Sequence, residues 1–266
     1  KKNKKRDDLE MIALGSKTAK AGLKNEKDVI SKFNKWQTDK VAQEWLEEMG
    51  YAIRDIEYVK AEKVRGQYKA DIQVRVKIII KLKAQEDIVN LQVKLVSSPK
   101  SGFNQIDKRW VDKYVELWSI PADVEKILKL YTGEIKPIKK GLKDPRRMKI
   151  FEMDETDQEK LINFIKKNKI LIASDLLKGR GEFSADWILV ILKVNGESRW
   201  ALKSINEAMN VFGGGEVRIT PKGSLWIGKI FMQRKGGDGG RETAKMLQFK
   251  INALLFSLIP YQNITF

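Results

Sequence analysis

The stretch ADIQVRVKIIIKLKAQEDIVNLQVKLVS, residues 70–97, decides the fold. Between residues 72 and 80, apolar side chains at every second position alternate mostly with polar ones, which is the periodicity of a strand. The polar turn AQED then leads into a second apolar run, residues 88–96, which is also strand-like. We therefore predict two neighbouring strands that can pair as a hairpin.

Upstream of this hairpin the apolar residues follow the spacing of helices. Residues 26–36 place four apolar side chains near one helical face, at Val29, Ile30, Phe33 and Trp36. Asn25 is positioned to cap this helix. Residues 41–49 predict a second helix that ends at Gly50.

Downstream of residue 97 both kinds of pattern occur. We predict helices over residues 104–118, from Pro121 to about Tyr131, over 155–167, over about 204–212 and over about 242–250. A hairpin is predicted from Trp187, with NGES between its strands. Two further strands, 216–220 and 225–233, flank the turn PKGS. These elements predict an α/β or α+β fold with a mixed sheet flanked by helices.

The length of 266 residues is sufficient for one sizeable core or two packed lobes. A loop rich in lysine, proline and glycine spans about residues 133–150. We expect one compact domain over residues 1–266, with a possible division into lobes 1–132 and 151–266.

The composition excludes several classes of active site, because the chain has neither cysteine nor histidine. Disulfides, His/Cys zinc sites, and serine or cysteine triads with histidine are therefore ruled out. Any protein-bound metal must rest mainly on oxygen ligands, which favours a hard cation such as Mg²⁺ or Mn²⁺.

The formal charge is +17, from 52 basic and 35 acidic residues. Such a balance favours a polyanionic partner, because lysine and arginine displace counterions from phosphates. A biased genome composition, membrane-surface binding and ribosome association are the alternatives. No apolar run approaches the ~18 residues that a membrane span needs, and no signal peptide is visible, so we expect a soluble cytoplasmic protein.

The candidate catalytic pattern consists of Asp71, twenty intervening residues, and then Gln92-Val93-Lys94. Residues two apart on a strand point to the same side, so Gln92 and Lys94 project together. If the two strands pair, Asp71 can lie beside them. Read by itself, this pattern is more often a set of polar surface positions, since loose patterns match by chance.

These residue types are suited to phosphodiester hydrolysis. Asp71, the Gln92 side-chain carbonyl and the Val93 main-chain carbonyl can hold one or two divalent cations, which activate a water. Lys94 can orient or deprotonate that water or stabilise the oxyanion. Glu26, on the first predicted helix, can add a carboxylate.

A glycine-rich segment, residues 233–241, has the side chains that read guanine and cytosine in the major groove. Its glycines allow close approach of the backbone. The alternative is a hairpin turn with solvated charges. The candidate contacts are Gln233, Arg234, Lys235, Asp238 and Arg241. On the predicted first helix, Lys17, Lys20 and Lys24 are candidates for phosphate contacts.

Six segments carry a family resemblance that covers most of the chain. They are LGSKTAK at 14–20, KNEKD at 24–28, QVKLVS at 92–97, GFNQIDK at 102–108, KGRGEF at 178–183 and QRKGGDGGRETAKMLQFKI at 233–251. With these segments the chain resembles the HinP-one-I type of type IIP restriction endonucleases. That family cuts at GCGC, is related in fold to MspI, and belongs to the PD-(D/E)xK nucleases, which have a central mixed sheet flanked by helices.

The resemblance implies a catalytic centre of Asp71, Gln92 and Lys94, with metal at Asp71, Gln92 and the Val93 carbonyl. Gln92 departs from the wider PD-(D/E)xK pattern, in which an acid is usual, although the resembled enzyme also has glutamine there. No proline precedes Asp71, and Ala70 stands where the resembled enzyme has a serine.

The resemblance also implies contacts to DNA from residues 102–108. Gln105 is expected to insert at the minor-groove side and Lys108 to contact bases or phosphates, with Asn104 beside them. The structural alternatives are an ordinary first-turn polar residue and a solvated lysine. In this reading the lobe 1–132 is catalytic and the lobe 151–266 recognises DNA.

The resulting expectation is a Mg²⁺-dependent endonuclease, with Mn²⁺ as a substitute, that cuts double-stranded DNA at GCGC or a close variant. It would act as a monomer or weak dimer, paired in the cell with a cytosine methyltransferase. A repair or junction nuclease on the same core, and a DNA-binding protein that does not cleave, are the alternatives.

Overall fold

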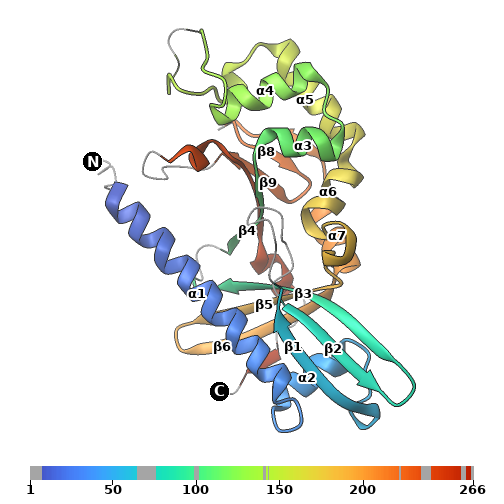
Figure 1. Ribbon diagram of the computed structural model, residues 1–266. Coiled ribbons are helices and arrows are strands. Elements are labelled where there is room, and N and C mark those ends of the chain that lie inside the picture. Colours follow the sequence, from blue (N-terminus) through green and yellow to red (C-terminus); the bar gives the residue numbers. More distant parts are fainter. Residues whose placement is uncertain are drawn as a thin grey trace. The chain divides into compact units, whose positions relative to one another are not determined.

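The computed structural model describes residues 8–64, 76–98, 102–139, 142, 144–221, 223–234, 241–258 and 262–264 (Figure 1). Four of the residues singled out above lie outside these ranges: Ala70, Asp71, Lys235 and Asp238.

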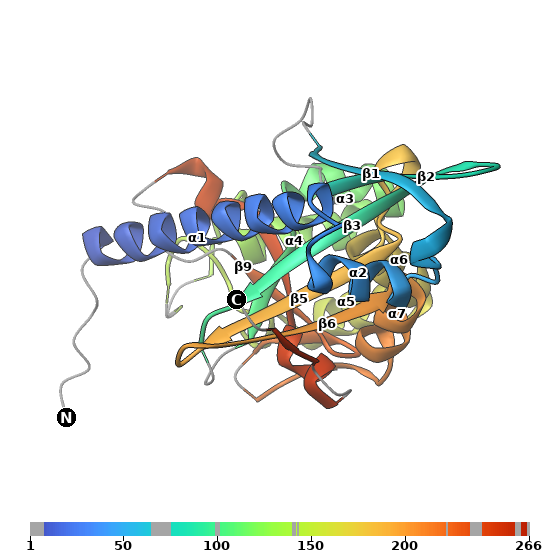
Figure 2. The same cartoon turned by 90° about the horizontal axis from the view of Figure 1, so that it is seen from below.

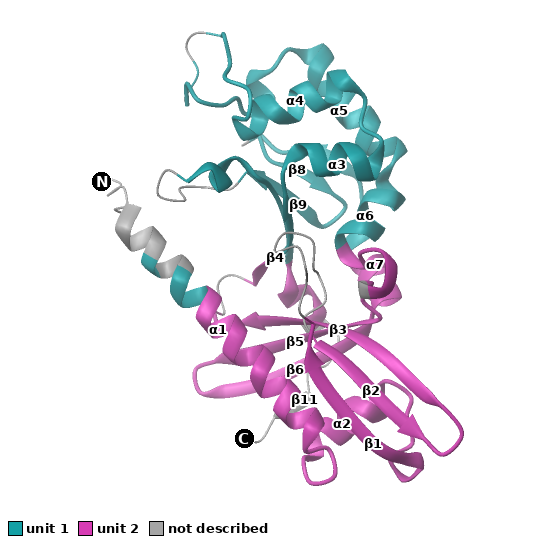
Figure 3. Ribbon diagram, viewed as in Figure 1, with its two compact units in different colours: residues 1–18, 105–176, 212–251 teal, residues 19–104, 177–211, 252–266 magenta. Residues whose placement is uncertain are grey.

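The chain forms two compact units (Figure 3). Unit 1 comprises residues 1–18, 105–176 and 212–251, and unit 2 comprises residues 19–104, 177–211 and 252–266. We expected one compact domain, with a possible division into lobes on either side of residues 133–150. Each unit instead contains three separate segments, because its sheet takes strands from distant parts of the sequence.

Unit 2 contains a six-stranded sheet in the order β1-β2-β3-β5-β6-β11. Its strands are β1 (Ile56–Lys63), β2 (Val76–Leu82), β3 (Glu86–Val96), β5 (Trp187–Val194), β6 (Glu197–Ser204) and β11 (Gln262–Ile264). Strands β2 and β3 form the predicted antiparallel hairpin, whereas β3 and β5 are parallel. The predicted mixed sheet is thereby confirmed.

Two helices, α1 (Asp8–Asn34) and α2 (Lys40–Glu48), supply the apolar layer on one face of this sheet (Figure 2). Phe33 and Trp45 meet at 5.2 Å between ring centroids, in a cluster that includes Leu91 and Val93 of β3. Because side chains alternate along a strand, the residues between these two project from the other face. That second face carries Gln92 and Lys94.

The first helix is longer than its apolar pattern indicated. We expected Asn25 to be its cap, but α1 already begins at Asp8, so Asn25 lies within the helix. Residues 8–24 contain no proline and are rich in lysine, leucine and alanine, which are good helix formers. The second helix ends as predicted, with Gly50 at φ +94°.

Unit 1 contains most of a five-stranded sheet in the order β4-β10-β9-β8-β7. Its strands are β4 (Phe103–Arg109), β7 (Val217–Ile219), β8 (Leu225–Ile227), β9 (Ile230–Arg234) and β10 (Leu247–Asn252). The remaining α-helices are α3 (Val111–Trp118), α4 (Ala122–Thr132), α5 (Glu155–Lys167), α6 (Lys169–Leu177) and α7 (Ile205–Gly213). The short 3-10 turns are η1 (Ile53–Asp55), η2 (Ile150–Glu152), η3 (Gly181–Phe183), η4 (Glu242–Lys245) and η5 (Ala253–Leu258).

Two predicted helices contain strands in the structure. Residues 104–118 form most of β4 and then α3, and residues 242–250 form the short η4 and then β10. Leu247, Phe249 and Ile251 are buried apolar residues at every second position, with polar Gln248 and Lys250 between them, which is the residue pattern of a strand. The helical spacing of apolar residues within 104–118 comes from α3 alone.

The predicted strand over 225–233 is two strands, β8 and β9, joined by a turn at Gly228. Gly228 has φ +59°, and a Cβ there would lie 2.5 Å from the main-chain oxygen of Gly214, so only glycine fits. The hairpin between β5 and β6 is confirmed, with Asn195 and Gly196 at positive φ as a type I′ turn requires. Strand β1 and helix α6 were not predicted.

Among the described residues, no helix is both long enough and apolar enough to span a membrane.

Candidate active site and DNA-contact strands

Strand β3 places Gln92 and Lys94 on one face of the unit 2 sheet. Gln92 is fully buried, and its Nε2 donates a hydrogen bond to the main-chain oxygen of Leu177 at 3.2 Å. Lys94 is partly buried. Because the donating end of the Gln92 amide is directed at Leu177, its carbonyl oxygen is directed away from that residue.

Asp71 lies outside the described residues, so its approach to Gln92 stays a prediction. The described chain resumes at Val76, which stands opposite Leu91 in the β2–β3 register. Leu91 immediately precedes Gln92. The strand that follows Asp71 in the sequence therefore begins at the level of the candidate site.

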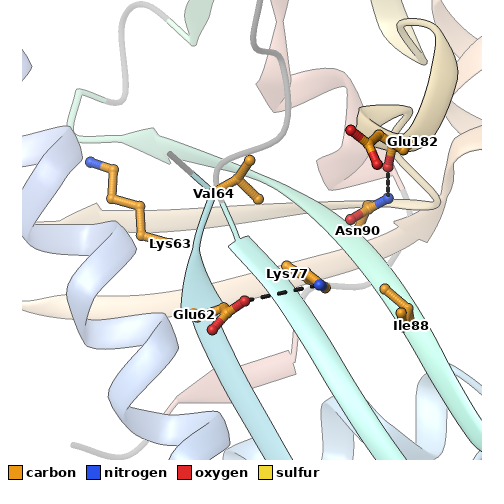
Figure 4. A pocket seen from close by; sticks show the side chains of 7 residues that line it. All are labelled: Glu62, Lys63, Val64, Lys77, Ile88, Asn90 and Glu182. Carbon is orange, nitrogen blue, oxygen red and sulfur yellow. Dashed lines mark hydrogen bonds and ion pairs between the residues drawn. The ribbon is translucent and has the colours of Figure 1, made fainter. Parts of the chain in front are cut away.

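A hollow of about 630 Å³ opens beside this face of β3 (Figure 4). Its lining is mostly polar or charged: Glu62, Lys63, Val64, Lys77, Ile88, Asn90 and Glu182. Asn90 is two residues before Gln92 on the same strand, and therefore on the same face. A hollow with charged walls suits a polar ligand better than an apolar one.

The hollow is framed by contacts between neighbouring strands. Lys77 on β2 stands opposite Asn90 on β3 and forms an ion pair of 4.0 Å with Glu62 on β1. The Asn90 side chain donates to the main-chain oxygens of Glu182 and Ser184 at 2.9 and 3.1 Å. These contacts fix Asn90 against the segment that precedes β5.

Glu26 reaches the edge of this hollow from α1. It is 9% exposed and forms an ion pair of 3.3 Å with Lys63, one of the lining residues. Figure 4 shows Lys63 directed away from Glu62 and Lys77, toward α1. The structure therefore brings Glu26 to Lys63, a partner that the sequence pattern did not indicate.

The oxygen atoms of the candidate residues on β3 are of the kind that bind a hard cation. The Gln92 amide and the Val93 main chain both offer oxygen, and the sequence places Asp71 upstream as the carboxylate. Within the ranges that the structure describes, no three acidic residues cluster as a complete metal site. Metal binding that involves Asp71 stays a prediction.

Strand β4 carries the second set of predicted residues. We expected residues 102–108 to open a helix, but Asn104, Gln105 and Lys108 lie on a strand. Gln105 is exposed, and its Oε1 accepts a hydrogen bond from Nε2 of Gln248 on β10. The Asn104 side chain donates to the main-chain oxygen of Gly102 at 3.0 Å.

A buried ionic network behind β4 was not predicted. Arg109 lies 3.4 Å from a carboxylate oxygen of Asp107 and donates to Asp175 at 3.0 Å. The Tyr114 hydroxyl donates to Asp107 at 2.8 Å, and the Trp118 indole donates to Asp175 at 2.9 Å. Burial raises the pKa of Asp107 to about 6 despite the nearby Arg109. This network joins β4 to α3 and α6.

Gln233 and Arg234, at the end of β9, have different surroundings. Gln233 is partly buried and stands opposite Gln248. Arg234 donates to the main-chain oxygen of Met148 at 3.3 Å and lies over the Tyr131 ring at 5.6 Å. Burial lowers the pKa of Arg234. Its guanidinium is thus engaged by the protein itself, whereas Arg241, just before η4, is exposed.

Comparison with known proteins identifies the family to which the chain belongs. The family model described as R.HinP1I restriction endonuclease matches residues 49–256. No curated protein matches the chain. Among solved structures, restriction endonuclease MspI in complex with its cognate DNA is similar at a TM-score of 0.63 and 13% identity, covering 89% of this chain and 91% of that one.

The MspI match confirms the predicted fold, and the family match covers every strand of the two sheets except β11. Both agree with the resemblance found in the sequence segments. The chain belongs to the R.HinP1I restriction endonuclease family and is a type II site-specific deoxyribonuclease.

Proposed function

We propose that this endonuclease hydrolyses both strands of double-stranded DNA at GCGC or a close variant, with Mg²⁺ as its cofactor and Mn²⁺ as a substitute. The observation that carries the proposal is the placement of Gln92 and Lys94 on one face of β3, beside a hollow with polar walls. In a chain without histidine or cysteine, lysine and oxygen ligands are the groups suited to this chemistry.

In this proposal Asp71, the Gln92 amide oxygen and the Val93 carbonyl hold the cation. When bound, the cation supplies an activated water and neutralises charge on the scissile phosphate. Lys94 holds the attacking water, takes its proton or stabilises the developing oxyanion. Its partial burial strengthens these interactions, because charges act more strongly where water is excluded.

Glu26 has a supporting place in this scheme. In this proposal it adds a carboxylate through its ion pair with Lys63, a residue that lines the hollow. Gln92 is neutral where related nucleases carry an acid, which weakens metal binding. Ala70 leaves out the hydroxyl that the resembled enzymes place next to the aspartate.

For DNA recognition we propose contacts from both strands that flank β10 and from the loop after β9. The residues are Asn104, Gln105, Lys108, Gln233, Arg234, Lys235, Asp238 and Arg241. Exposed Lys17, Lys20 and Lys24 on α1 provide phosphate contacts, which position the duplex without reading its sequence. The cellular partner would be a cytosine methyltransferase of the same specificity, and the enzyme would act in the cytoplasm as a monomer or weak dimer.

Digestion of plasmid DNA with Mg²⁺, and with EDTA as the control, tests this function. Discrete fragments that share one tetranucleotide at their ends, and that disappear with EDTA, are the expected result. Cuts that follow DNA structure rather than sequence would instead indicate a repair or junction nuclease. Binding without any cleavage would indicate a DNA-binding protein with an inactive site.

A further inference from the structure

Asp186 is a partly buried carboxylate that directly precedes β5 and bonds to strand β3. One of its carboxylate oxygens accepts a hydrogen bond from the main-chain N–H of Asn90 at 2.8 Å, and its own main-chain N–H donates to the Asn90 carbonyl at 2.9 Å. The first regular pair of the parallel β3–β5 ladder, Leu91 with Trp187, follows immediately. Both main-chain groups of Asn90 are therefore bonded to Asp186, to which the proposed function above gives no role.

Asn90 holds the same segment in return. Its side chain donates to the main-chain oxygen of Glu182 at 2.9 Å (Figure 4) and to that of Ser184 at 3.1 Å. Two residues that are 96 positions apart, Asn90 and Asp186, thus each use a side chain to bind the main chain of the other's segment. These bonds fix residues 182–186 on β3.

The other end of this segment reaches Gln92. Ala185, next to Asp186, donates its main-chain N–H to the oxygen of Lys178 at 2.7 Å. Lys178 directly follows Leu177, whose main-chain oxygen accepts the hydrogen bond from Gln92 Nε2 at 3.2 Å. Ala185, Leu177 and Gln92 are all fully buried, and close-packed groups cannot shift independently of their neighbours. The segment is therefore a closed loop, and both of its ends are bonded to β3.

These bonds matter because the sequence of the loop is not rigid by itself. Residues 178–183, KGRGEF, contain two glycines, Gly179 and Gly181, both at positive φ. Glycine loses more conformational freedom on folding than any other residue, so ordering this loop has an entropic cost that its contacts must offset. A hydrogen bond to a charged carboxylate is one of the stronger contacts for this purpose.

We propose that Asp186 is a positioning residue of the active site. Its carboxylate holds segment 177–186 on β3, and so holds the Leu177 carbonyl where it binds the Gln92 amide. This inference rests on the proposed function, in which Gln92 is a ligand of the cation. Asp186 acts through Leu177 and Gln92 and does not itself touch the cation or DNA.

Three substitutions separate positioning from stability. Asp186→Ala removes the acceptor of the Asn90 N–H, whereas Asp186→Asn keeps an oxygen that can accept the same bond. Asp39→Ala is the matched control, because Asp39 is also a partly buried carboxylate of unit 2 that accepts a main-chain N–H, that of Ala42 at 3.1 Å. It caps α2, on the face of the sheet opposite to Gln92.

The readouts are kcat on a cognate duplex and the Mn²⁺ affinity of the DNA-free protein, measured by calorimetry. We expect Asp186→Ala to lower both about tenfold, since groups that hold a metal ligand in place contribute about 10–100-fold. Asp186→Asn should stay close to the wild type. Asp39→Ala should lower the thermal midpoint, as Asp186→Ala does, without changing kcat or the affinity.

A further measurement needs neither metal nor DNA. In ¹⁵N-labelled protein, Asp186→Ala should shift the side-chain NH₂ signals of Gln92, which are assigned by their loss in Gln92→Glu, and Asp39→Ala should leave them in place. The wild type alone provides a test that does not depend on any variant folding. Its Asn90 main-chain N–H should exchange slowly with solvent, and rapid exchange would overturn the inference.

Four other results would also overturn it: wild-type kcat and Mn²⁺ affinity in Asp186→Ala, equal losses in Asp186→Asn, the same losses in Asp39→Ala, or unshifted Gln92 signals in Asp186→Ala. A wild-type chain that neither binds Mn²⁺ nor cleaves DNA would contradict the proposed function instead, and this is seen before any variant is compared.

Discussion

Strand β3 alternates polar Gln92 and Lys94 with apolar Leu91 and Val93, whereas β4 buries charged Asp107 and Arg109 a few residues from the exposed Gln105. On β3 the polar residues point away from an apolar core that α1 and α2 complete. On β4 the polar residues are themselves part of the buried structure. The partly buried Lys94 on β3 is therefore expected to be separable from folding, whereas the fully buried Gln92 and the charged residues of β4 contribute to the buried structure.

The largest effect is expected at Lys94. Lys94→Ala should lower the cleavage rate by at least about 10²–10³-fold, because it removes a group that acts on the reacting phosphate. Duplex affinity in Ca²⁺ and the thermal midpoint should stay close to those of the wild type. Lys81→Ala, on neighbouring β2, is the matched control and should cleave normally. Cleavage by Lys94→Ala at the wild-type rate would remove β3 from the active site.

On β4, Arg109→Leu should lower the free energy of unfolding. It leaves Asp107 and Asp175 buried without their cation, a change that costs about 3–5 kcal/mol when a buried pair is broken. Arg146→Leu is the control, because the Arg146–Asp144 pair has an exposed arginine and should contribute less than about 1 kcal/mol. Urea unfolding measures both. Equal losses would contradict a structural role for the network.

The same network predicts a pH dependence of stability. Burial raises the pKa of Asp107 from 3.8 to about 6, so the folded state holds this proton more tightly than the unfolded chain. The resulting stabilisation is complete below about pH 3.8 and is lost as pH rises through about 6. The thermal midpoint of the wild type minus that of Asp107→Asn should fall between pH 4 and pH 7. A difference independent of pH would refute the shift.

The smallest effect concerns the loop after β9. We expect Asp238→Ala to cost about 1–3 kcal/mol of cognate binding, as for one lost base contact, without altering the thermal midpoint. Arg234→Ala should weaken binding similarly and also lower the midpoint, because Arg234 contacts Met148 and Tyr131. Duplex titrations and thermal melts of the two variants separate the two roles. An unchanged midpoint for Arg234→Ala would show that its contacts do not contribute to stability.

The difference between β3 and β4 also explains what the sequence could predict. The β2–β3 hairpin was predicted because one face of it packs on an apolar core. Such packing places apolar residues at every second position of the sequence. On β4, neighbouring Ile106 and Asp107 are both buried, so the alternation is lost. The amphipathic α3 that follows then made the whole window resemble a helix.

The sequence indicated candidate residues, but it did not indicate which of them lie close together in space. The amide pair Gln105 and Gln248 is separated by 143 positions, and the network of Arg109 with Asp175 by 66. No periodicity relates residues at such distances, because their proximity depends on sheet order and on the packing of α3 and α6. Gln248 lies within a segment that resembles the family, but it comes close to Gln105 only because β10 is the neighbour of β4 in the sheet.

Sequencing the ends of a limit digest, with the wild type and Lys94→Ala treated in parallel with Mg²⁺, tests the central claim most directly. We predict that every wild-type end derives from one short GC palindrome, GCGC or a close variant, and that Lys94→Ala yields no ends above background while still binding the same duplex. Ends without a common sequence, or the same ends from Lys94→Ala, would contradict a site-specific nuclease centred on β3.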